Sequence, residues 1–340
     1  MTPKTPNLSD FKKDELINIV SSFKDRKIAV VGDVMLDKYV WGNAERISPE
    51  APVLIVDVQE ESKRLGGAAN TACNLASLGA IPIMFGVIGN DQAGQDVCTM
   101  LEHLRCDYSN LVVSDKKITT QKTRLLARNH QIVRVDREIK GRLPSNEEEK
   151  IADTIESNAK DYSGIIISDY GKGVVSELLC NRLEQLYLDG TIGDIHRPIL
   201  IDPKKENFNI YKGATIIKPN RSEAELASGI KIRTVNDAIK AADILKQKWN
   251  SKYVMITLSE DGMVVAGDES PVVAPAISKQ VFDVSGAGDT VSAVFTLALS
   301  SGANLMQAAV LANLAAGIVI GEVGTVAIGA AELLNAIDDY

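Results

Sequence analysis

The sequence has 340 residues and is poor in the residue types that mark several classes of protein. Its three histidines show no spacing typical of a metal site. Its four cysteines form no CxxC pair and lie inside periodic segments, so we expect buried, reduced thiols rather than disulfides or a zinc site. Aromatic residues make up only 5% of the chain and the net charge is −8, which disfavours base stacking and a basic surface. We therefore expect no nucleic-acid partner.

Long apolar runs are also missing. The longest apolar stretch, residues 308–321, is interrupted by Asn313 and is too short to span a bilayer. The N-terminal segment does not show the basic, apolar and small-residue order of a secretory signal. We therefore expect a cytoplasmic protein without a membrane partner.

Several nucleotide-binding and catalytic motifs are absent as well. No GxxxxGK[ST] sequence occurs, which excludes a P-loop enzyme. The residues after the first predicted strand read GDVM from Gly32 onward, and they do not fit the GxGxxG fingerprint of dinucleotide-binding proteins. No Ser or Cys nucleophile motif is present either. The chemistry of this chain must therefore depend on other residues.

Short β-branched runs alternate with helical patterns along most of the chain. Strands are predicted at 27–31, 81–88, 164–168, 198–201, 214–218, 252–257 and 262–266. Helices are predicted at 67–78, 92–104, 146–157, 174–186, 221–227, 235–249, 287–299, 305–320 and 330–337. The strands are almost continuously apolar, as in central strands that are covered on both faces. This alternation predicts an α/β protein with a parallel sheet between two layers of helices.

Residues 37–58 and 118–136 interrupt this alternation. Both segments read as extended pieces with charges at many positions, and neither is followed directly by a crossover helix. We expect them to form a small antiparallel sheet that stands off the main domain as a lid over a small-molecule site. Because no linker marks a second domain, we expect one domain over residues 1–340 that carries these two lid insertions. The edges of such a lid need covering, so we expect a homodimer that pairs two lids.

The strongest local motif is DVSGAGDT, residues 283–290, at the start of an apolar helix. Gly286, Ala287 and Gly288 leave backbone N–H groups open at a helix N-terminus, which attracts anions. Asp289 would repel a phosphate there unless it accepts a proton from a hydroxyl that attacks phosphorus. A glycine-rich turn followed by a favourable acid in the first helical turn explains the same residues. Both interpretations stay open at this point.

A second motif, GGAAN, opens another helix of small residues. Gly66 and Gly67 permit a ligand to approach the backbone closely, and Asn70 offers a donor and an acceptor to a sugar hydroxyl. Tight packing of the helix on the sheet explains the same residues. This motif alone does not distinguish a binding site from a packing site.

Two further motifs follow predicted strands, at the edge where open α/β sheets bind ligands. Asn220 and Glu223 could hold a hydrated Mg²⁺ beside phosphates, or form a helix capping box, and both can hold at once. In the segment SDYGKG, residues 168–173, Lys172 could reach an anionic group, although a solvated loop lysine explains the same position.

Taken together, these segments resemble the ribokinase/PfkB superfamily of carbohydrate kinases. Residues 66–89 resemble the first family signature in the order and spacing of their glycines, and residues 283–293 resemble the second. The latter continues with Val294, where the family pattern prefers Ala or Gly. The family's Asn-x-x-Glu motif matches residues 220–223. The resemblance covers essentially the whole chain.

A narrower resemblance concerns the kinases of D-glycero-D-manno-heptose 7-phosphate, which serve lipopolysaccharide precursor synthesis. It rests on GDVMLD at 32–37, ERISPEAPV at 45–53 and SDYGKG at 168–173. Some kinases of this group are fused to a nucleotidyltransferase domain. No HxGH motif occurs among the three histidines, so we expect the stand-alone type of kinase.

The resemblance implies a ribokinase-like α/β fold, with a central, mostly parallel sheet flanked by helices and a small β-sheet lid. It also implies ATP as phosphate donor, Mg²⁺, often a monovalent cation such as K⁺, and transfer to the anomeric C1 hydroxyl of the sugar phosphate. By this resemblance Asp289 is the catalytic base. The amides that would bind the transferred phosphoryl group belong to Gly286, Ala287 and Gly288. The nucleotide and Mg²⁺ side would be lined by Asn220, Arg221, Ser222 and Glu223. The sugar would be bound by Asp37, Gly66, Gly67 and Asn70.

An acceptor that already carries a phosphate needs cations in its site. The candidates are Arg46, Arg124, Arg128 and Lys172. The region of Asp283 and Ser285, and loop 317–324, could supply oxygens to a monovalent cation. Two alternatives stay open: a PfkB-type kinase for another sugar or sugar phosphate, and a non-catalytic sugar-binding regulator.

Overall fold

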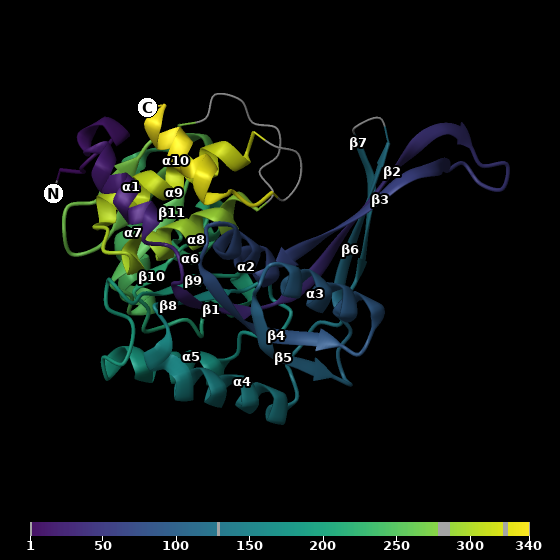
Figure 1. Cartoon of the computed structure of the whole chain (residues 1–340), viewed down its shortest axis with the longest axis horizontal. Helices are drawn as coiled ribbons and strands as arrows, with labels where there is room; N and C mark the ends of the chain where they lie inside the picture. The colour runs from purple at the N-terminus through teal and green to yellow at the C-terminus, as the bar shows by residue number, and fades with distance from the viewer. Residues whose placement is uncertain (1, 128–129, 278–285, 322–325, 340) are drawn as a thin grey trace.

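A nine-stranded sheet forms the centre of the computed structural model, which describes residues 2–127, 130–277, 286–321 and 326–339 (Figure 1). The strands follow the order β13-β12-β11-β10-β9-β8-β1-β4-β5. They are β1 (Lys27–Gly32), β4 (Ile81–Gly89), β5 (Asp107–Ser114), β8 (Gly164–Ser168), β9 (Ile199–Asp202), β10 (Ile216–Ile217), β11 (Tyr253–Thr257), β12 (Met263–Ala266) and β13 (Val272–Ala274). From β5 to β11 the strands are parallel, whereas β12 and β13 pair antiparallel. The predicted mostly parallel sheet is confirmed, with a mixed edge.

Helices cover both faces of this sheet, as the apolar strands predicted. One layer holds α1 (Lys13–Ser21), α2 (Ala68–Ser77), α3 (Gln92–His103), α8 (Ala287–Ser300), α9 (Leu305–Val319) and α10 (Ala330–Asp338). The other holds α4 (Ser145–Asn158), α5 (Glu177–Leu188), α6 (Arg221–Ser228) and α7 (Val235–Trp249). Along β1, Ile28 and Val30 pack into the first layer, and Ala29 and Val31 into the second. Within the described part of the chain, no helix is long and apolar enough to cross a bilayer.

A second, four-stranded sheet projects from the main body (Figure 1). Its strands are β2 (Val34–Ile47), β3 (Leu54–Gly67), β6 (Thr120–Ala127) and β7 (His130–Arg137), in the order β3-β2-β6-β7. The first hairpin is longer than the predicted segment 37–58. The expectation of an antiparallel sheet is wrong at its centre, because β2 and β6 pair parallel while each hairpin is antiparallel. Strands β2 and β6 are the outgoing strands of their hairpins, so they run in the same direction.

Three elements lie outside the predicted set: strand β13, at one edge of the main sheet, strand β5 and helix α1. Strand β5 lies at the edge of the main sheet and carries polar residues at several positions, so it lacks the apolar signature of the central strands. Helix α1 packs against α10, a contact between segments near the two ends of the chain that no local sequence pattern predicts.

Helix α5 begins three residues later than predicted, because the Ser176 side chain caps it by accepting a hydrogen bond from the backbone N–H of Leu179. Short 3₁₀ turns lie at Leu8–Asp10, Ala159–Asp161, Lys205–Asn207 and Ser259–Asp261.

The order of the strands reverses at β1. From β1 the chain builds outward through β4 and β5, and it then returns to the other side of β1 to continue through β8 and β9. Loops at the carboxyl ends of β1 and β8 therefore diverge at this point, where open α/β sheets bind their ligands. Residues 33 and 169–173 lie there, and residue 33 leads directly into β2 of the second sheet.

Candidate active site

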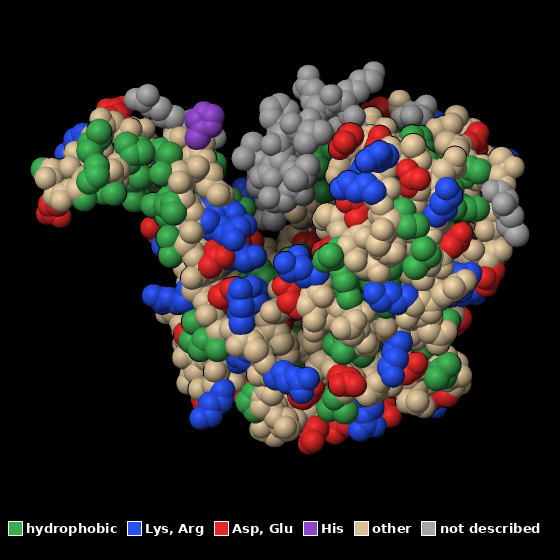
Figure 2. All heavy atoms as spheres, turned by 180° about the vertical axis from the view of Figure 1, so that it is seen from behind, with side chains coloured by type: hydrophobic (Ala, Val, Ile, Leu, Met, Phe, Trp, Pro, Cys, Tyr) green, Lys and Arg blue, Asp and Glu red, His purple; other side chains and the backbone are tan. Residues whose placement is uncertain are grey.

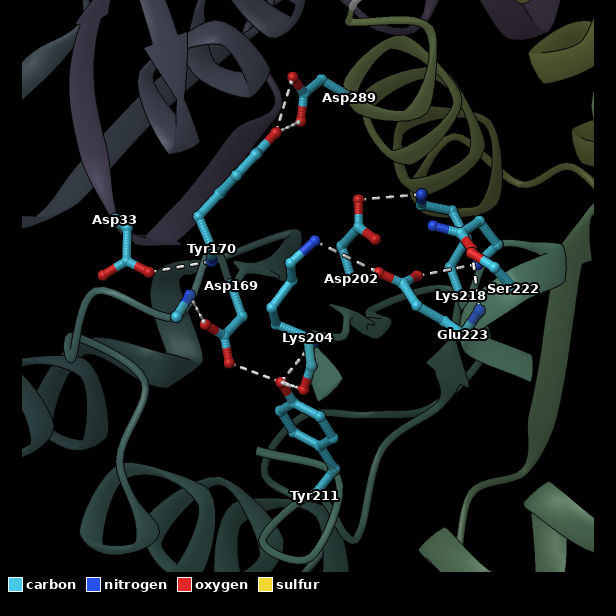
Figure 3. A network of polar contacts seen from close by, with 12 residues as sticks. Asp33, Asp169, Tyr170, Asp202, Lys204, Tyr211, Lys218, Ser222, Glu223 and Asp289 are labelled. Carbon is cyan, nitrogen blue, oxygen red and sulfur yellow. Dashed lines mark hydrogen bonds and ion pairs between the residues drawn. The ribbon is translucent and has the colours of Figure 1, made fainter. Parts of the chain in front are cut away.

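Asp289 lies in the first turn of α8 and is buried, with only 4% of its surface exposed. Its carboxylate accepts hydrogen bonds from the Asn70 amide at 2.7 Å and from the Thr71 hydroxyl at 3.1 Å. The Tyr170 hydroxyl lies 3.0 Å from one carboxylate oxygen and 3.2 Å from the other (Figure 3). Burial raises the pKa of Asp289 to about 6, and these hydrogen bonds oppose part of that rise. A buried carboxylate held by neutral donors, with a pKa just below neutrality, is suited to act as a general base.

The start of α8 has features that would suit an anion. Gly286, at the N-cap, has a φ of +84°, a left-handed conformation that favours glycine. The nearest heavy atom to a Cβ built on Gly288 would be the Lys218 Nζ, at 3.5 Å, so a buried ammonium group stands beside the first helical turn. The same Nζ lies 2.9 Å from the Asp202 carboxylate. Open backbone N–H groups and this ammonium together provide positive potential where a phosphoryl group would lie.

The joint between β3 and α2 explains why two glycines precede Asn70. Gly67 has a φ of +58°, and a Cβ built there would lie 2.3 Å from the carbonyl oxygen of Asp33. A Cβ on Gly66 would lie 2.4 Å from the Asp37 carboxylate. The glycines thus allow the helix to start close to both acids. The Asn70 amide donates to Asp289, so this side chain holds the acid in addition to any contact with a ligand.

The loop after β8 brings Tyr170 to Asp289. Asp33, at the end of β1, accepts hydrogen bonds from the backbone N–H groups of Tyr170, Lys172 and Val174, at 2.9, 3.0 and 3.1 Å. One buried carboxylate therefore fixes three residues of the loop. Burial raises the pKa of Asp33, and these backbone donors oppose the rise.

Asp169 anchors the same loop from the opposite side (Figure 3). Its carboxylate accepts from the Tyr211 hydroxyl at 2.5 Å and the Asn207 amide at 2.6 Å. Burial, with the neighbouring negative charge of Asp33, raises the pKa of Asp169 to about 6. The loop is therefore held by two adjacent buried acids.

Residues 220–223 form the helix capping box that the sequence allowed. The Asn220 side chain accepts from the backbone N–H of Glu223 at 3.0 Å, and the Glu223 carboxylate accepts from the backbone N–H of Asn220 at 3.0 Å. The Ser222 hydroxyl donates to the Asn220 side chain at 2.7 Å. The guanidinium of Arg221 bonds the carbonyl oxygens of Ile232 and Leu258, and joins α6 to the turn before β12. Asn220, Ser222 and Glu223 thus contact one another at the start of α6. The Arg221 side chain instead bonds to residues outside this group.

The carboxylates of Asp202 and Glu223 lie near each other between Lys218 and Lys204 (Figure 3). Burial and the nearby charge of Asp202 raise the pKa of Glu223. Among the described residues, no group of three or more His, Cys, Asp or Glu side chains could hold a metal ion by itself. Two carboxylates and an amide oxygen at a phosphate site nevertheless match the oxygen donors that Mg²⁺ takes while it keeps several waters.

The predicted cations of the second sheet have different partners. Arg124 donates to Asp37 at 2.5 Å, and both side chains are largely buried at the base of the sheet. The Lys172 ammonium lies 2.6 Å from the Glu138 carboxylate, close to the end of β7. Arg46 pairs with Asp57 on the exposed outer part of the first hairpin, away from this base. Arg128, Asp283, Ser285 and part of loop 317–324 lie outside the described residues.

A pocket of about 390 Å³ borders Asn70. It is lined by residues 63–65 of β3, by α2 and α3, and by residues 326–327. A larger cavity, of about 480 Å³, lies between α1, the end of α2 and α10 and contains none of the candidate residues. Asn70 lines the smaller pocket and also donates to Asp289, but Asp289 itself does not line that pocket.

The sequence did not single out four residues of this cluster. Thr71 and Tyr170 contact Asp289, and Lys218 and Asp202 form the ion pair beside α8. Tyr170 lies in the SDYGKG segment, where the sequence pointed to Lys172 instead, and Lys218 lies just before the Asn220–Glu223 motif. Asp202 directly follows the predicted strand 198–201, and the rule that strand ends carry ligand-binding residues could have found it.

Comparison with solved structures identifies the class of protein that this fold represents. The chain is similar to ribokinase from Arabidopsis thaliana complexed with ribose and ATP, with a TM-score of 0.70 and 16% identity over 92% of this chain and 99% of that one. It is also similar to phosphofructokinase-2 from Escherichia coli in complex with potassium, with a TM-score of 0.73 and 17% identity over 93% and 99% of the two chains. The fold is therefore ribokinase-like.

The sequence itself defines the family. The model of the pfkB family carbohydrate kinases matches residues 25–330. The bifunctional protein HldE of Helicobacter hepaticus is 43% identical over 314 residues, which are 92% of this chain and 64% of the relative. HldE of Geobacter metallireducens is 40% identical over 324 residues, 94% of this chain and 65% of the relative. The chain belongs to the pfkB family of carbohydrate kinases and spans about two thirds of the length of these relatives.

The family assignment confirms two expectations from the sequence. The ribokinase-like α/β fold is correct, and the protein is a carbohydrate kinase by family. A sugar kinase takes a sugar and ATP as its substrates. The particular sugar is a matter for proposal.

Proposed function

We propose that the protein transfers the γ-phosphoryl group of ATP to the anomeric C1 hydroxyl of D-glycero-D-manno-heptose 7-phosphate. The product is heptose 1,7-bisphosphate, a precursor of ADP-heptose for the lipopolysaccharide core. The observation that carries this proposal is the buried Asp289, held by neutral donors next to the anion site of α8, in a chain about 40% identical to the HldE proteins.

In the proposed reaction, each group near the start of α8 has one role. The C1 hydroxyl lies against Asp289, which takes its proton as the C1 oxygen forms a bond to the γ-phosphorus. The bond between that phosphorus and the bridging β–γ oxygen breaks, and its electron pair leaves with ADP. The N–H groups of residues 286–288 and the Lys218 ammonium stabilise negative charge on the transferred group. Exclusion of water by the second sheet, acting as a lid, suppresses hydrolysis of ATP.

Mg²⁺ belongs to this proposal. Asp202, Glu223 and Asn220 would hold it, largely through water, and bound there it would neutralise charge on the nucleotide phosphates. A monovalent cation such as K⁺ stays a prediction of the resemblance. The roles of Asp37, Gly66, Gly67 and Asn70 in sugar binding are proposals of the same kind, and they are supported by the closeness of all four to the start of α2.

A homodimer formed through the second sheet is also proposed. Hydrophobic side chains gather on the outer part of this sheet (Figure 2). The exposed residues there are Ile47, Val53, Leu54, Val58, Ile132, Val133 and Val135. Strands β3 and β7 are free edges of the sheet, since each has one neighbouring strand in the described residues. Pairing with a second copy would cover both the apolar surface and an edge.

A panel of acceptors tests the proposed substrate. Purified protein, ATP and Mg²⁺ would be incubated with heptose 7-phosphate, fructose 6-phosphate, ribose 5-phosphate, fructose and ribose in a coupled assay for ADP. We expect the highest kcat/KM with heptose 7-phosphate, and phosphorus NMR of the product should show a new phosphate on C1. A higher kcat/KM for any other acceptor would replace heptose 7-phosphate by that sugar.

A further inference from the structure

One face of the second sheet is lined by charged residues from all its strands. Strand pairing places Asp37 of β2 opposite Lys122 of β6, and Lys122 opposite Asp136 of β7. The next positions outward on the same face hold Arg124 and Arg134, which are opposite each other in β6 and β7. Residues directly opposite in neighbouring strands share a face of the sheet. Lys and Arg side chains gather where the second sheet joins the main body (Figure 2).

Most cations at this face already have a carboxylate partner. Arg124 binds Asp37, and Lys172 pairs with Glu138. The guanidinium of Arg134 binds Asp136 through two hydrogen bonds, of 2.8 and 3.0 Å. Each carboxylate holds its cation in place and offsets part of the attraction that the cation would exert on an anionic ligand.

Lys122 is different. No ion pair or hydrogen bond of its ammonium group is found among the described residues, and its Nζ instead lies 5.8 Å from the centre of the Tyr170 ring. Burial lowers the pKa of Lys122. The nearby negative charges of Asp37 and Asp136 oppose this shift, whereas the positive charges of Lys172 and Arg134 add to it. A partly desolvated cation without a carboxylate of its own has much to gain from an incoming anion.

The position of Lys122 relative to Asp289 is also informative. The Tyr170 hydroxyl contacts Asp289, and the Tyr170 ring lies under Lys122, so one tyrosine side chain separates the ammonium from the acid. A phosphorylated sugar whose reacting hydroxyl and phosphate are at opposite ends of its carbon chain has a comparable length. Such a molecule could contact Asp289 with one end and Lys122 with the other.

We propose that Lys122 binds the phosphate group of the acceptor sugar and so selects a sugar phosphate over an unphosphorylated sugar. This inference rests on the proposed function of the site, and it names a residue that was not among the four cations predicted from the sequence. Arg124, Arg134 and Lys172 surround the position and add long-range attraction, whereas Lys122 supplies the direct contact.

The test is Lys122→Met, which keeps the length of the stem and removes the charge. We expect the KM for the sugar phosphate to rise about 10- to 100-fold, with kcat changed less, because an ionic hydrogen bond to the substrate is lost. The KM for ATP and the kcat/KM for the same sugar without its phosphate should stay within about two-fold of wild type. Lys122→Arg, which restores a positive charge, should recover most of the affinity.

Lys38→Met is the matched control. Lys38 lies on β2 next to Asp37, points to the opposite face of the sheet and pairs with Glu61 at 2.8 Å. Its loss should leave both KM values unchanged, and melting curves of the two methionine variants should show that both fold.

The outcomes separate this inference from the proposed function. If wild type uses heptose 7-phosphate and Lys122→Met keeps its KM, the role of Lys122 is wrong and the proposed function stands. If wild type prefers another sugar phosphate and Lys122→Met raises the KM for it, the proposed substrate is wrong and the role of Lys122 stands. A wild-type enzyme that uses only unphosphorylated sugars would overturn both.

Discussion

Asp289 owes its properties to its surroundings rather than to its residue type. An aspartate in water is ionised far below neutral pH and is a weak base, whereas burial at the start of α8 raises the pKa of this one to about 6. Its buried negative charge is stabilised by hydrogen bonds from Asn70, Thr71 and Tyr170, which are neutral donors. A single position thus combines a raised proton affinity with a fixed orientation.

Replacement of Asp289 by asparagine removes the base and keeps the shape of the side chain. We expect kcat to fall by about 10² to 10⁴, because proton transfer from the acceptor hydroxyl loses its catalyst. The coupled ADP assay measures kcat, and calorimetry should show that sugar binding is largely kept. Turnover within a few-fold of wild type would contradict the assignment of Asp289 as the base.

Replacement of Tyr170 by phenylalanine removes a donor to both oxygens of Asp289. Because this hydrogen bond favours the ionised form, its loss should raise the pKa of Asp289 further above about 6. The base works only when ionised, so the acidic limb of kcat/KM against pH should move to higher pH, while activity at high pH is largely kept. Rates between about pH 5 and 9 measure this shift.

Tyr211→Phe is the control for that profile. The Tyr211 hydroxyl donates to Asp169 and makes no hydrogen bond to Asp289, so its removal should leave the acidic limb in place. An unmoved limb in Tyr170→Phe would show that Tyr170 does not influence the proton affinity of the base.

Among the helices and strands, the joint between β3 and α2 connects the second sheet to the site. Gly66 and Gly67 end a strand of the second sheet, and the helix that follows presents Asn70 and Thr71 to Asp289. The joint also packs against Asp33 and Asp37.

Alanine at position 67 tests this joint. A Cβ there would meet the carbonyl oxygen of Asp33 at 2.3 Å in a residue with a φ of +58°, so we expect the free energy of unfolding to fall by about 2–4 kcal/mol. Urea denaturation measures the loss. Gly190→Ala is the control, because Gly190 has a φ of +73° with no heavy atom within 4 Å of its Cβ position.

The Gly190 variant reports the cost of the backbone conformation alone, about 1 kcal/mol. The difference between the two variants then measures the close contact with Asp33 together with the strain of the ψ of −137° at Gly67. Equal losses would mean that the joint relaxes and that Gly67 is needed for its backbone angle only.

The molecule as a whole places a nine-stranded body beneath a sheet with two free edges and an apolar outer surface. The two hairpins of that sheet come from distant parts of the chain, and they meet through the parallel pairing of β2 and β6. Their inner face is charged and turned toward the site, whereas hydrophobic side chains gather farther out (Figure 2). On this division we propose that the inner face serves the site and that the outer part serves self-association.

Light scattering tests that division. Wild type should have twice the mass of the 36.6 kDa chain at micromolar concentration, and a variant with both Val58→Glu and Val135→Glu should be monomeric. Leu226→Glu, at an exposed apolar residue of α6 on the main body, should remain dimeric. A monomeric wild type would remove the proposed dimer.

Local patterns in the sequence determined the alternation of strands and helices and the motifs at their ends. Both signals are short-range: a central strand must be apolar at every position, and a helix start that binds an anion must have small residues. The boundaries of α2, α7 and α8 were therefore predicted to within one residue. Strand β5 was missed, because an edge strand with polar positions carries no such pattern.

Only the tertiary structure decided which side chains meet. Asp289 and Asn70 are separated by 219 positions, and Tyr170 lies between them in the chain, so nothing local records their contact. The same holds for Lys218 beside Gly288 and for Lys122 above Tyr170. The sequence specified which residues could perform the chemistry, and the order of the strands, which turns back at β1, brought them to one place.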